Sequence, residues 1–218
     1  MKRNGIILVV AGALMSPSWA VADIGVGVKV GTLGAGVELT KDFSSRFNGR
    51  VGFNTLKLDR SGTEDDINYD INLELSSVTL LLDWHPFNGG FRVTGGAAVN
   101  NNELALVGKS NTSYTIGDNT YTPAEVGTLT GDVTFDNLTP YLGIGWGNAV
   151  GEDDKITFAL DIGVLFQGST EAKLSADGSL ASDPTFQADL AKEEQNLNQS
   201  LDDFELYPVI SAGIAYHF

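Results

Sequence analysis

The feature of this sequence that limits its fold most is the regular alternation of large apolar side chains with small or polar ones. It is clearest in the stretch ITFALDIGVLF (156–166), where every second residue from Ile156 to Phe166 is large and apolar. The residues between them are Thr, Ala, Asp, Gly and Leu. Because successive side chains of a β-strand point to opposite faces, this period predicts strands with one apolar face.

The same rule predicts eight strands along the chain. They cover residues 23–31, 34–43, 47–60, 69–85, 90–107, 132–147, 155–168 and 204–218. The third and fourth change phase near Thr55-Leu56 and Ser76-Ser77, which predicts a β-bulge in each strand. The connections at 43–47, 85–90 and 148–155 are short, whereas those at 61–68, 108–131 and 169–203 are long. This layout is typical of transmembrane β-barrels, whose short turns are periplasmic and whose long loops are extracellular.

The second face of the strands decides which solvent the apolar face meets. A soluble up-and-down barrel points its apolar face inward and needs a charged exterior. Here the second face offers residues such as Gly143, Gly163 and Gly213, which suit the crowded interior of an eight-stranded barrel. The expected fold is therefore all-β: an eight-stranded antiparallel up-and-down transmembrane β-barrel, with Ile162 and Ile214 facing lipid.

The N-terminus predicts export. Lys2 and Arg3 precede an apolar run at 6–15, and small residues that suit cleavage after Ala20 or Ala22 follow. The run is too short to span a membrane as a helix, so residues 1–22 are expected to be a secretory signal peptide and residues 23–218 a single barrel domain. The chain has no cysteine and a net charge of −15, which disfavours nucleic acid as a partner.

The last long loop is expected to contain a helix at about 184–203. Asp183 followed by Pro184 is a helix-start signal, and ADLAKEEQNLNQSLDD (188–203) is rich in helix formers. A helix packed against the barrel rim and a partner-binding helix are both compatible with this pattern.

Aromatic residues gather near the short-turn end, where a membrane interface is expected. Trp84, Phe91 and Trp146 would form a girdle there. The closing sequence YPVISAGIAYHF adds Tyr216 and Phe218 at the third-last and last positions.

This ending resembles the terminal strand that bacterial outer-membrane barrels present to their assembly machinery. With its signal peptide, eight strands and long loops, the chain is similar to small barrels such as the outer membrane protein A transmembrane domain and its OmpX- and OmpW-type relatives. The resemblance implies an assembly signal at Tyr216 and Phe218. It also implies a Gram-negative outer membrane location, lipid and lipopolysaccharide as neighbours, periplasmic termini and a monomer.

Six charged residues fall on the inward face. Three are positive and three are negative: Lys29, Glu38, Arg50, Asp83, Arg92 and Asp161. Burial requires them to pair, and a neutral network of ion pairs would block a water path. The same residues would also serve a narrow gated conduit, so the sequence leaves both hypotheses open.

No catalytic, cofactor or metal site is expected. The two histidines, His85 and His217, both lie at the short-turn end, away from the long loops. A lipid A-modifying enzyme, whose site would lie near the outer rim, is therefore the third alternative. The acidic stretches TEDDINYD (63–70) and GEDDK (151–155) lack the ligand spacing of a calcium loop. The expected function is a non-enzymatic, structural or surface-exposed barrel.

Overall fold

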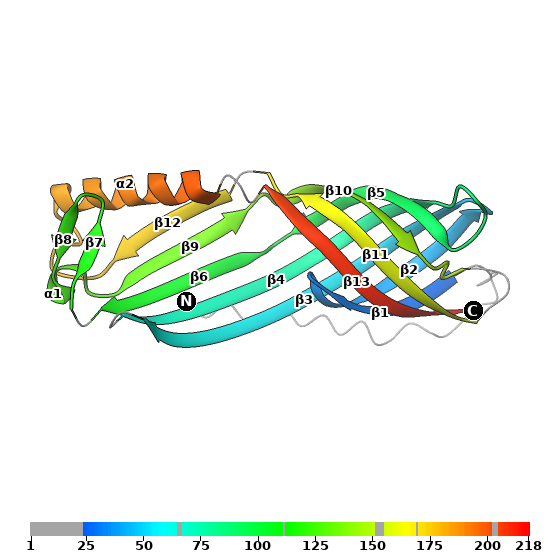
Figure 1. Ribbon diagram of the computed structural model, residues 1–218, viewed down its shortest axis with the longest axis horizontal. Helices are drawn as coiled ribbons and strands as arrows, with labels where there is room; N and C mark the ends of the chain where they lie inside the picture. Colours follow the sequence, from blue (N-terminus) through cyan, green and yellow to red (C-terminus); the bar gives the residue numbers. More distant parts are fainter. Residues whose placement is uncertain (1–23, 65–66, 111, 151–154, 169, 202–204) are drawn as a thin grey trace, which may run out of the picture.

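A closed antiparallel barrel forms one end of the molecule (Figure 1). The computed structural model describes residues 24–64, 67–110, 112–150, 155–168, 170–201 and 205–218, and the expected signal peptide lies outside these ranges. The eight barrel strands are β1 (Ile24–Gly31), β2 (Gly34–Ser44), β3 (Phe47–Glu64), β4 (Ile67–Trp84), β5 (Phe91–Asn100), β10 (Leu138–Trp146), β11 (Ile156–Phe166) and β13 (Leu206–His217). The barrel closes because β1 pairs with β2 on one side and with β13 on the other. The predicted eight-stranded architecture is confirmed.

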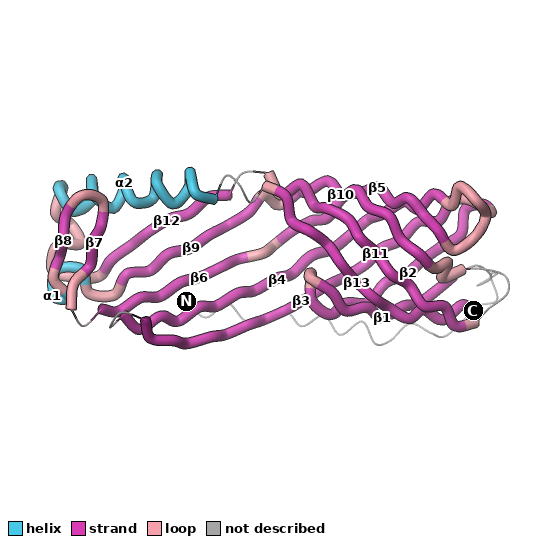
Figure 2. The backbone as a smooth tube through the Cα atoms, viewed as in Figure 1, coloured by secondary structure: helices cyan, strands magenta, loops and turns pink. Residues whose placement is uncertain are grey.

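The segments expected to be long loops mostly continue the sheet. Beyond the barrel, β4 pairs with β6 (Glu103–Ser110), β6 with β9 (Leu129–Phe135), and β9 with β12 (Thr170–Ala176). Together with the far halves of β3 and β4 they form an open curved sheet, called here the extended sheet (Figure 2). The long connections expected at 108–131 and 169–203 are therefore shorter than predicted, because the ends of β6 and β9 and the whole of β12 lie within them and lengthen the barrel wall.

Two predicted strands are interrupted where the barrel meets the extended sheet. The strand expected at 90–107 is divided into β5 and β6, and the one expected at 132–147 into β9 and β10. The register on β4 is nevertheless the same on both sides, with Ser77 opposite Asn100 and Glu74 opposite Glu103. Asn102 explains the interruption, because its side-chain oxygen accepts the backbone N–H of Ser76 at 3.0 Å.

The bulges expected in β3 and β4 are not found. Their ladder is unbroken from the pair Phe47 and Trp84 to the pair Glu64 and Ile67. What changes is the solvent. In the barrel the outward positions are apolar, as at Phe53, whereas in the extended sheet they are charged, as at Lys57, and the leucines turn to the inner face. The apolar residues therefore move from the outward to the inward positions of the alternation, while the strand itself continues without a bulge.

A helix and a small hairpin cover the tip of the extended sheet. Hairpin β7 (Tyr114–Ile116) and β8 (Asn119–Tyr121) leads into the one-turn helix α1 (Pro123–Val126), and α2 (Pro184–Leu201) lies along β12. Phe186 is fully buried beside Tyr121, with ring centroids 5.0 Å apart. Among the described residues, no helix is both long and apolar enough to cross a bilayer.

The start of α2 is the one the sequence predicts. Asp183 accepts the backbone N–H of Thr185 at 2.9 Å and that of Phe186 at 3.0 Å, which caps the helix. The predicted end, residues 202–203, lies outside the described residues.

Side chains of α2 also satisfy the free edge of β12. Asn198 accepts the N–H of Ala172 at 2.8 Å and donates to its carbonyl at 3.3 Å, while Glu194 accepts the N–H of Leu174 at 2.7 Å. Unpaired edge strands invite pairing with other chains, so these contacts protect the sheet on that side.

Candidate functional site

The outer surface of the barrel is a continuous apolar band. Leu80 is 66% exposed and Phe158 is 72% exposed, and Ile162 and Ile214 also point outward, as expected. Soluble monomeric proteins rarely expose large apolar side chains in such a contiguous patch. The band is the surface of a barrel built for an apolar surrounding.

The structure places the aromatic residues singled out in the sequence on this outer surface, at the short-turn end. Phe47 lies opposite Trp84, and Phe91 opposite Trp146. Tyr216 and Phe218 contact each other edge to face, with centroids 5.0 Å apart.

The six inward charges form one connected network across the lumen. Arg50 is its centre, because the guanidinium lies 2.6 Å from Asp83, 3.2 Å from Asp161 and 3.2 Å from Glu38. Lys29 pairs with Glu38 at 2.7 Å, and Arg92 pairs with Asp161 at 2.8 Å. We call this network the ionic layer.

The ionic layer is neutral and tightly enclosed. Its three cations balance its three carboxylates, and the Arg50 and Arg92 side chains are each only 3% exposed. Arg92 also donates to the carbonyl of Gly147. Glycine in the wall makes room for these groups: a Cβ at Gly145 would lie 2.8 Å from Asp161 Oδ1 and 2.9 Å from Arg92 Nε. Each buried charge thus has an opposite charge within ion-pair distance, although Arg50 Nε and Arg92 Nε make no hydrogen bond.

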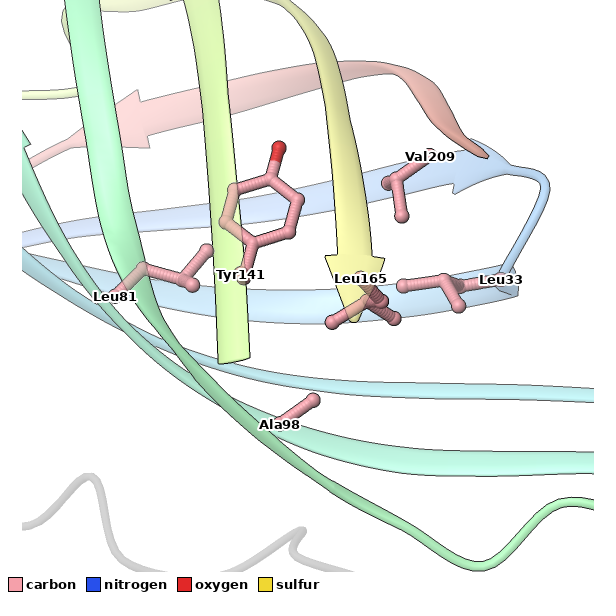
Figure 3. Close-up of a cluster of buried hydrophobic side chains, with 6 residues drawn as sticks. All are labelled: Leu33, Leu81, Ala98, Tyr141, Leu165 and Val209. Carbon is pink, nitrogen blue, oxygen red and sulfur yellow. The ribbon is translucent and has the colours of Figure 1, made fainter. Parts of the chain in front are cut away.

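A second closure, which the sequence reasoning missed, lies between the ionic layer and the extended sheet. Figure 3 shows its six buried side chains, five from different strands and one, Leu33, from the turn between β1 and β2, which meet in the lumen. They are Leu33, Leu81, Ala98, Tyr141, Leu165 and Val209. We call this cluster the apolar layer. The available signal was the large apolar residue inside a polar run, such as Leu81 between Thr79 and Asp83.

Tyr141 depends on two glycines. A Cβ at Gly143 would lie 2.5 Å from the Tyr141 hydroxyl oxygen, and a Cβ at Gly163 would overlap the same oxygen. These glycines therefore leave the space that the phenol ring occupies in the lumen. The wall glycines, which the sequence reasoning assigned to a crowded interior, are positions of close approach.

Polar side chains fill the two ends of the lumen. Toward the extended sheet, Asn54 donates to Ser77 at 3.3 Å. At the short-turn end, the amide of Asn48 contacts the amide of Asn148 at 2.9 Å and His85 Nε2 at 3.2 Å. His85 is 1% exposed, and its other ring nitrogen lies 2.8 Å from the carbonyl of Gly89.

Two small cavities lie inside the described part of the barrel. One cavity of 30 Å³ and another of 20 Å³ share Lys29, Arg50 and Asp161 as lining residues, so the ionic layer borders both. Each has room for only one or two water molecules. Within the described ranges, no three His, Asp or Glu side chains are grouped so that they could hold a metal ion.

Comparison with known proteins supports the fold and nothing finer. No family model matches the sequence, and no curated protein matches it. Among solved structures, Acinetobacter baumannii CarO2 is similar with a TM-score of 0.61 and 18% identity, over 90% of this chain and 99% of that chain. Acinetobacter baumannii CarO is similar with a TM-score of 0.58 and 19% identity, over 89% of this chain and 97% of that chain. The expected resemblance to small eight-stranded barrels is confirmed at the level of the fold.

Proposed function

We propose that this chain is a non-enzymatic barrel of a Gram-negative outer membrane, with a closed lumen and an extended sheet that is presented to the cell exterior. The observation that carries the proposal is the double closure of the lumen. The ionic layer and the apolar layer lie one above the other, and the cavities of 30 and 20 Å³ have room for only one or two waters each. Such a barrel holds its position in the membrane but passes no solute of any size.

The membrane placement follows from what the outside of the barrel carries. Apolar side chains cover the barrel strands, and exposed ion pairs begin on the extended sheet, where Lys57 lies 2.7 Å from Glu74 and Lys173 lies 3.1 Å from Glu171. A surface of this kind suits hydrocarbon around the barrel and water around the extended sheet. By the usual arrangement of such barrels, the short turns and both termini are periplasmic.

The partners of the barrel follow from this placement. Lipid and lipopolysaccharide would surround the apolar band, and Trp84, Phe91 and Trp146 would lie at the periplasmic interface. Tyr216 and Phe218 would be read by the assembly machinery. The closed barrel has no free edge and α2 covers the edge of β12, which leaves only the far half of β3 as an uncovered edge among the described strands of this sheet; the proposed state is a monomer.

The surface contacts of the protein are assigned to the extended sheet, the β7–β8 hairpin and α2. The hairpin is held to the helix by side chains at its turn: Asn119 donates to Asp189 at 2.7 Å, and Glu193 accepts the backbone N–H of Gly117 at 3.3 Å. A rigid exposed platform of this kind is suited to contacts outside the membrane and needs no conduit beneath it.

Planar bilayer recordings of the purified protein test the proposal. We expect no steady conductance from the wild type. A Lys57→Ala variant, which removes a cation from an exposed ion pair outside the lumen, is the matched control. Discrete openings in the wild type that change in Arg92→Ala or Asp161→Ala, and not in Lys57→Ala, would replace the closed barrel with a gated conduit.

The gated conduit is the second candidate, and one observation favours it. The two water-sized cavities share Arg50 and Asp161 as lining residues, so a rearrangement of these pairs would join them. A lipid A-modifying activity has no such support, because both histidines lie at the short-turn end. Unchanged lipid A in cells that overexpress the protein is the expected result, and altered lipid A would contradict the non-enzymatic assignment.

A further inference from the structure

A groove with a volume of 680 Å³ crosses the outer surface of the barrel over strands β2 to β5. Its outward-facing lining is almost entirely apolar. The main contributors are Leu39, Phe43, Val51, Leu80, Leu82 and Gly95. Arg50 also borders the groove, but its guanidinium group faces the lumen, where it pairs with Asp83.

Two glycines create the groove. In the row of side chains that crosses neighbouring strands, Leu82 has Gly49 on one side and Gly95 on the other. A Cβ at Gly95 would have nothing within 4 Å, so this position is open space on the outer surface. The Phe43 ring closes over Gly49, 2.7 Å from where its Cβ would be, and forms one wall. The result is a groove on the outside of the barrel that is open to its surroundings.

One cation lies at the short-turn end of this groove. Lys41 is exposed, and its direct cross-strand neighbours are Ile24 and Gly49, with Leu39 and Phe43 next along its own strand face. Among the described residues it has no ion pair or side-chain hydrogen bond, in contrast to Lys29, which faces inward and pairs with Glu38. The Lys41 ammonium group therefore stands among apolar side chains, three residues before the end of β2 at Ser44.

We propose that the groove binds one acyl chain of an anionic diacyl phospholipid, whose headgroup phosphate contacts Lys41. The inference rests on the proposed membrane placement. Three residues of strand correspond to about 10 Å, so the long lysine side chain can direct its ammonium group to the headgroup layer while its methylenes lie along the apolar lining. A single lysine near an anionic headgroup contributes about 1 kcal/mol, which is about fivefold in affinity.

A second groove on the same band provides an internal comparison. It has a volume of 730 Å³ and is lined by residues that include Val28, Ala35, Val37, Phe53 and Ile214. The only charged lining residue among those described is Lys29, whose ammonium group is used by Glu38 in the lumen. Volume and apolar character are similar in the two grooves, so the headgroup contact is what distinguishes them.

The test is lipid retention by the purified barrel in detergent, measured by native mass spectrometry with palmitoyl-oleoyl-phosphatidylglycerol as the probe. Lys41→Met is expected to weaken binding about fivefold, and Lys41→Arg to restore it. Gly95→Leu fills open space and is expected to abolish the bound lipid without disturbing the fold. Ala35→Leu, which fills the second groove, is the matched control and should leave retention unchanged. Phosphatidylcholine is expected to bind less tightly than phosphatidylglycerol to the wild type. The two lipids are expected to bind Lys41→Met with equal affinity.

Retention that is unchanged in both Lys41→Met and Gly95→Leu would overturn the site. An equal loss in Ala35→Leu would overturn it as well, because it would show general coating of the band by lipid. Failure of the membrane placement is recognised separately. In that case the wild-type barrel would stay monodisperse in water without detergent, whereas failure of the site alone leaves a detergent-dependent barrel with a heat-shifted gel band.

Discussion

Removal of Arg50 is the strongest single perturbation of the lumen. Its guanidinium contacts three carboxylates, at 2.6 Å for Asp83 and 3.2 Å for both Asp161 and Glu38, and its side chain is 3% exposed. In Arg50→Met the lumen goes from neutral to one net negative charge. Breaking a buried ion pair from one side costs about 3–5 kcal/mol, because the remaining charge is left without its partner.

The structure also limits that cost. Asp161 keeps Arg92 at 2.8 Å, and Glu38 keeps Lys29 at 2.7 Å, so Asp83 is the carboxylate that loses most. Its remaining cation, Arg92, is 3.7 Å away. We therefore expect a loss near the lower end, about 3 kcal/mol, and recovery of most of it when Asp83→Asn is added to remove the stranded charge.

Urea unfolding of the barrel in lipid vesicles, followed by the heat-shifted gel band and tryptophan emission, measures this change. Lys57→Ala is the control, since its ion pair is more than half exposed and is expected to contribute no more than about 1 kcal/mol. A loss in Arg50→Met no larger than that of the control would refute the reasoning. An Asp83→Asn addition that deepens the loss would do the same.

Three further predictions concern the helix, the hairpin contact and the apolar layer. Asp183→Ala removes the cap of α2 and is expected to cost about 1 kcal/mol, seen as faster amide exchange in its first turn; unchanged exchange would contradict the cap. The hydrogen bond between Tyr121 and Asp189 raises the tyrosine pKa to about 12 and lowers the aspartate pKa. The hydrogen bond between Tyr121 and Asp189 therefore stabilises the hairpin fully from about pH 4 to about pH 10. This stabilisation is lost as pH rises through about 12, where the tyrosine ionises, and in acid as pH falls through the lowered aspartate pKa. Limited proteolysis should detect the alkaline loss, and Tyr121→Phe should show no such alkaline step. Gly163→Val displaces the Tyr141 ring and is expected to destabilise the barrel by about 1–3 kcal/mol in urea, so an unchanged midpoint would argue against the glycine's role.

The fold was predictable for the part of the chain in which the strands keep the same surroundings, which is the barrel. Alternation gave the barrel strands and their outward face, because lipid on one side and a packed lumen on the other produce a uniform period of two. At Thr55 and Ser76 the apolar residues change faces, which sequence alone reads as a bulge. The structure shows an unbroken ladder whose surroundings change instead. The extended sheet was missed for the same reason, since its strands do not carry the lipid-facing pattern.

The sequence was sufficient to predict which residues form the ionic layer, but not which of them contact one another. The inward charges could be named because a charge on the apolar face would be costly. That Arg50 contacts Asp161, 111 positions away, depends on strand order and barrel closure. The apolar layer escaped prediction because Leu81 and Leu165 are inward residues of the usual lipid-facing type. Alternation assigns them a face but cannot show that they meet.

The change of face on β3 and β4 also fixes the height at which the protein sits in a bilayer. Phe53 and Val78 form the last apolar outward pair, and four pairs further along the ladder Lys57 lies opposite Glu74. Sinking the barrel would carry this charged pair toward hydrocarbon, at a cost that grows to about 2–4 kcal/mol for a lysine at mid-depth. Raising it would lift Trp84 and Trp146 out of the opposite boundary. The protein is thus restrained in both directions along the bilayer normal. A bilayer that is thicker or thinner than the apolar band must deform locally to match it.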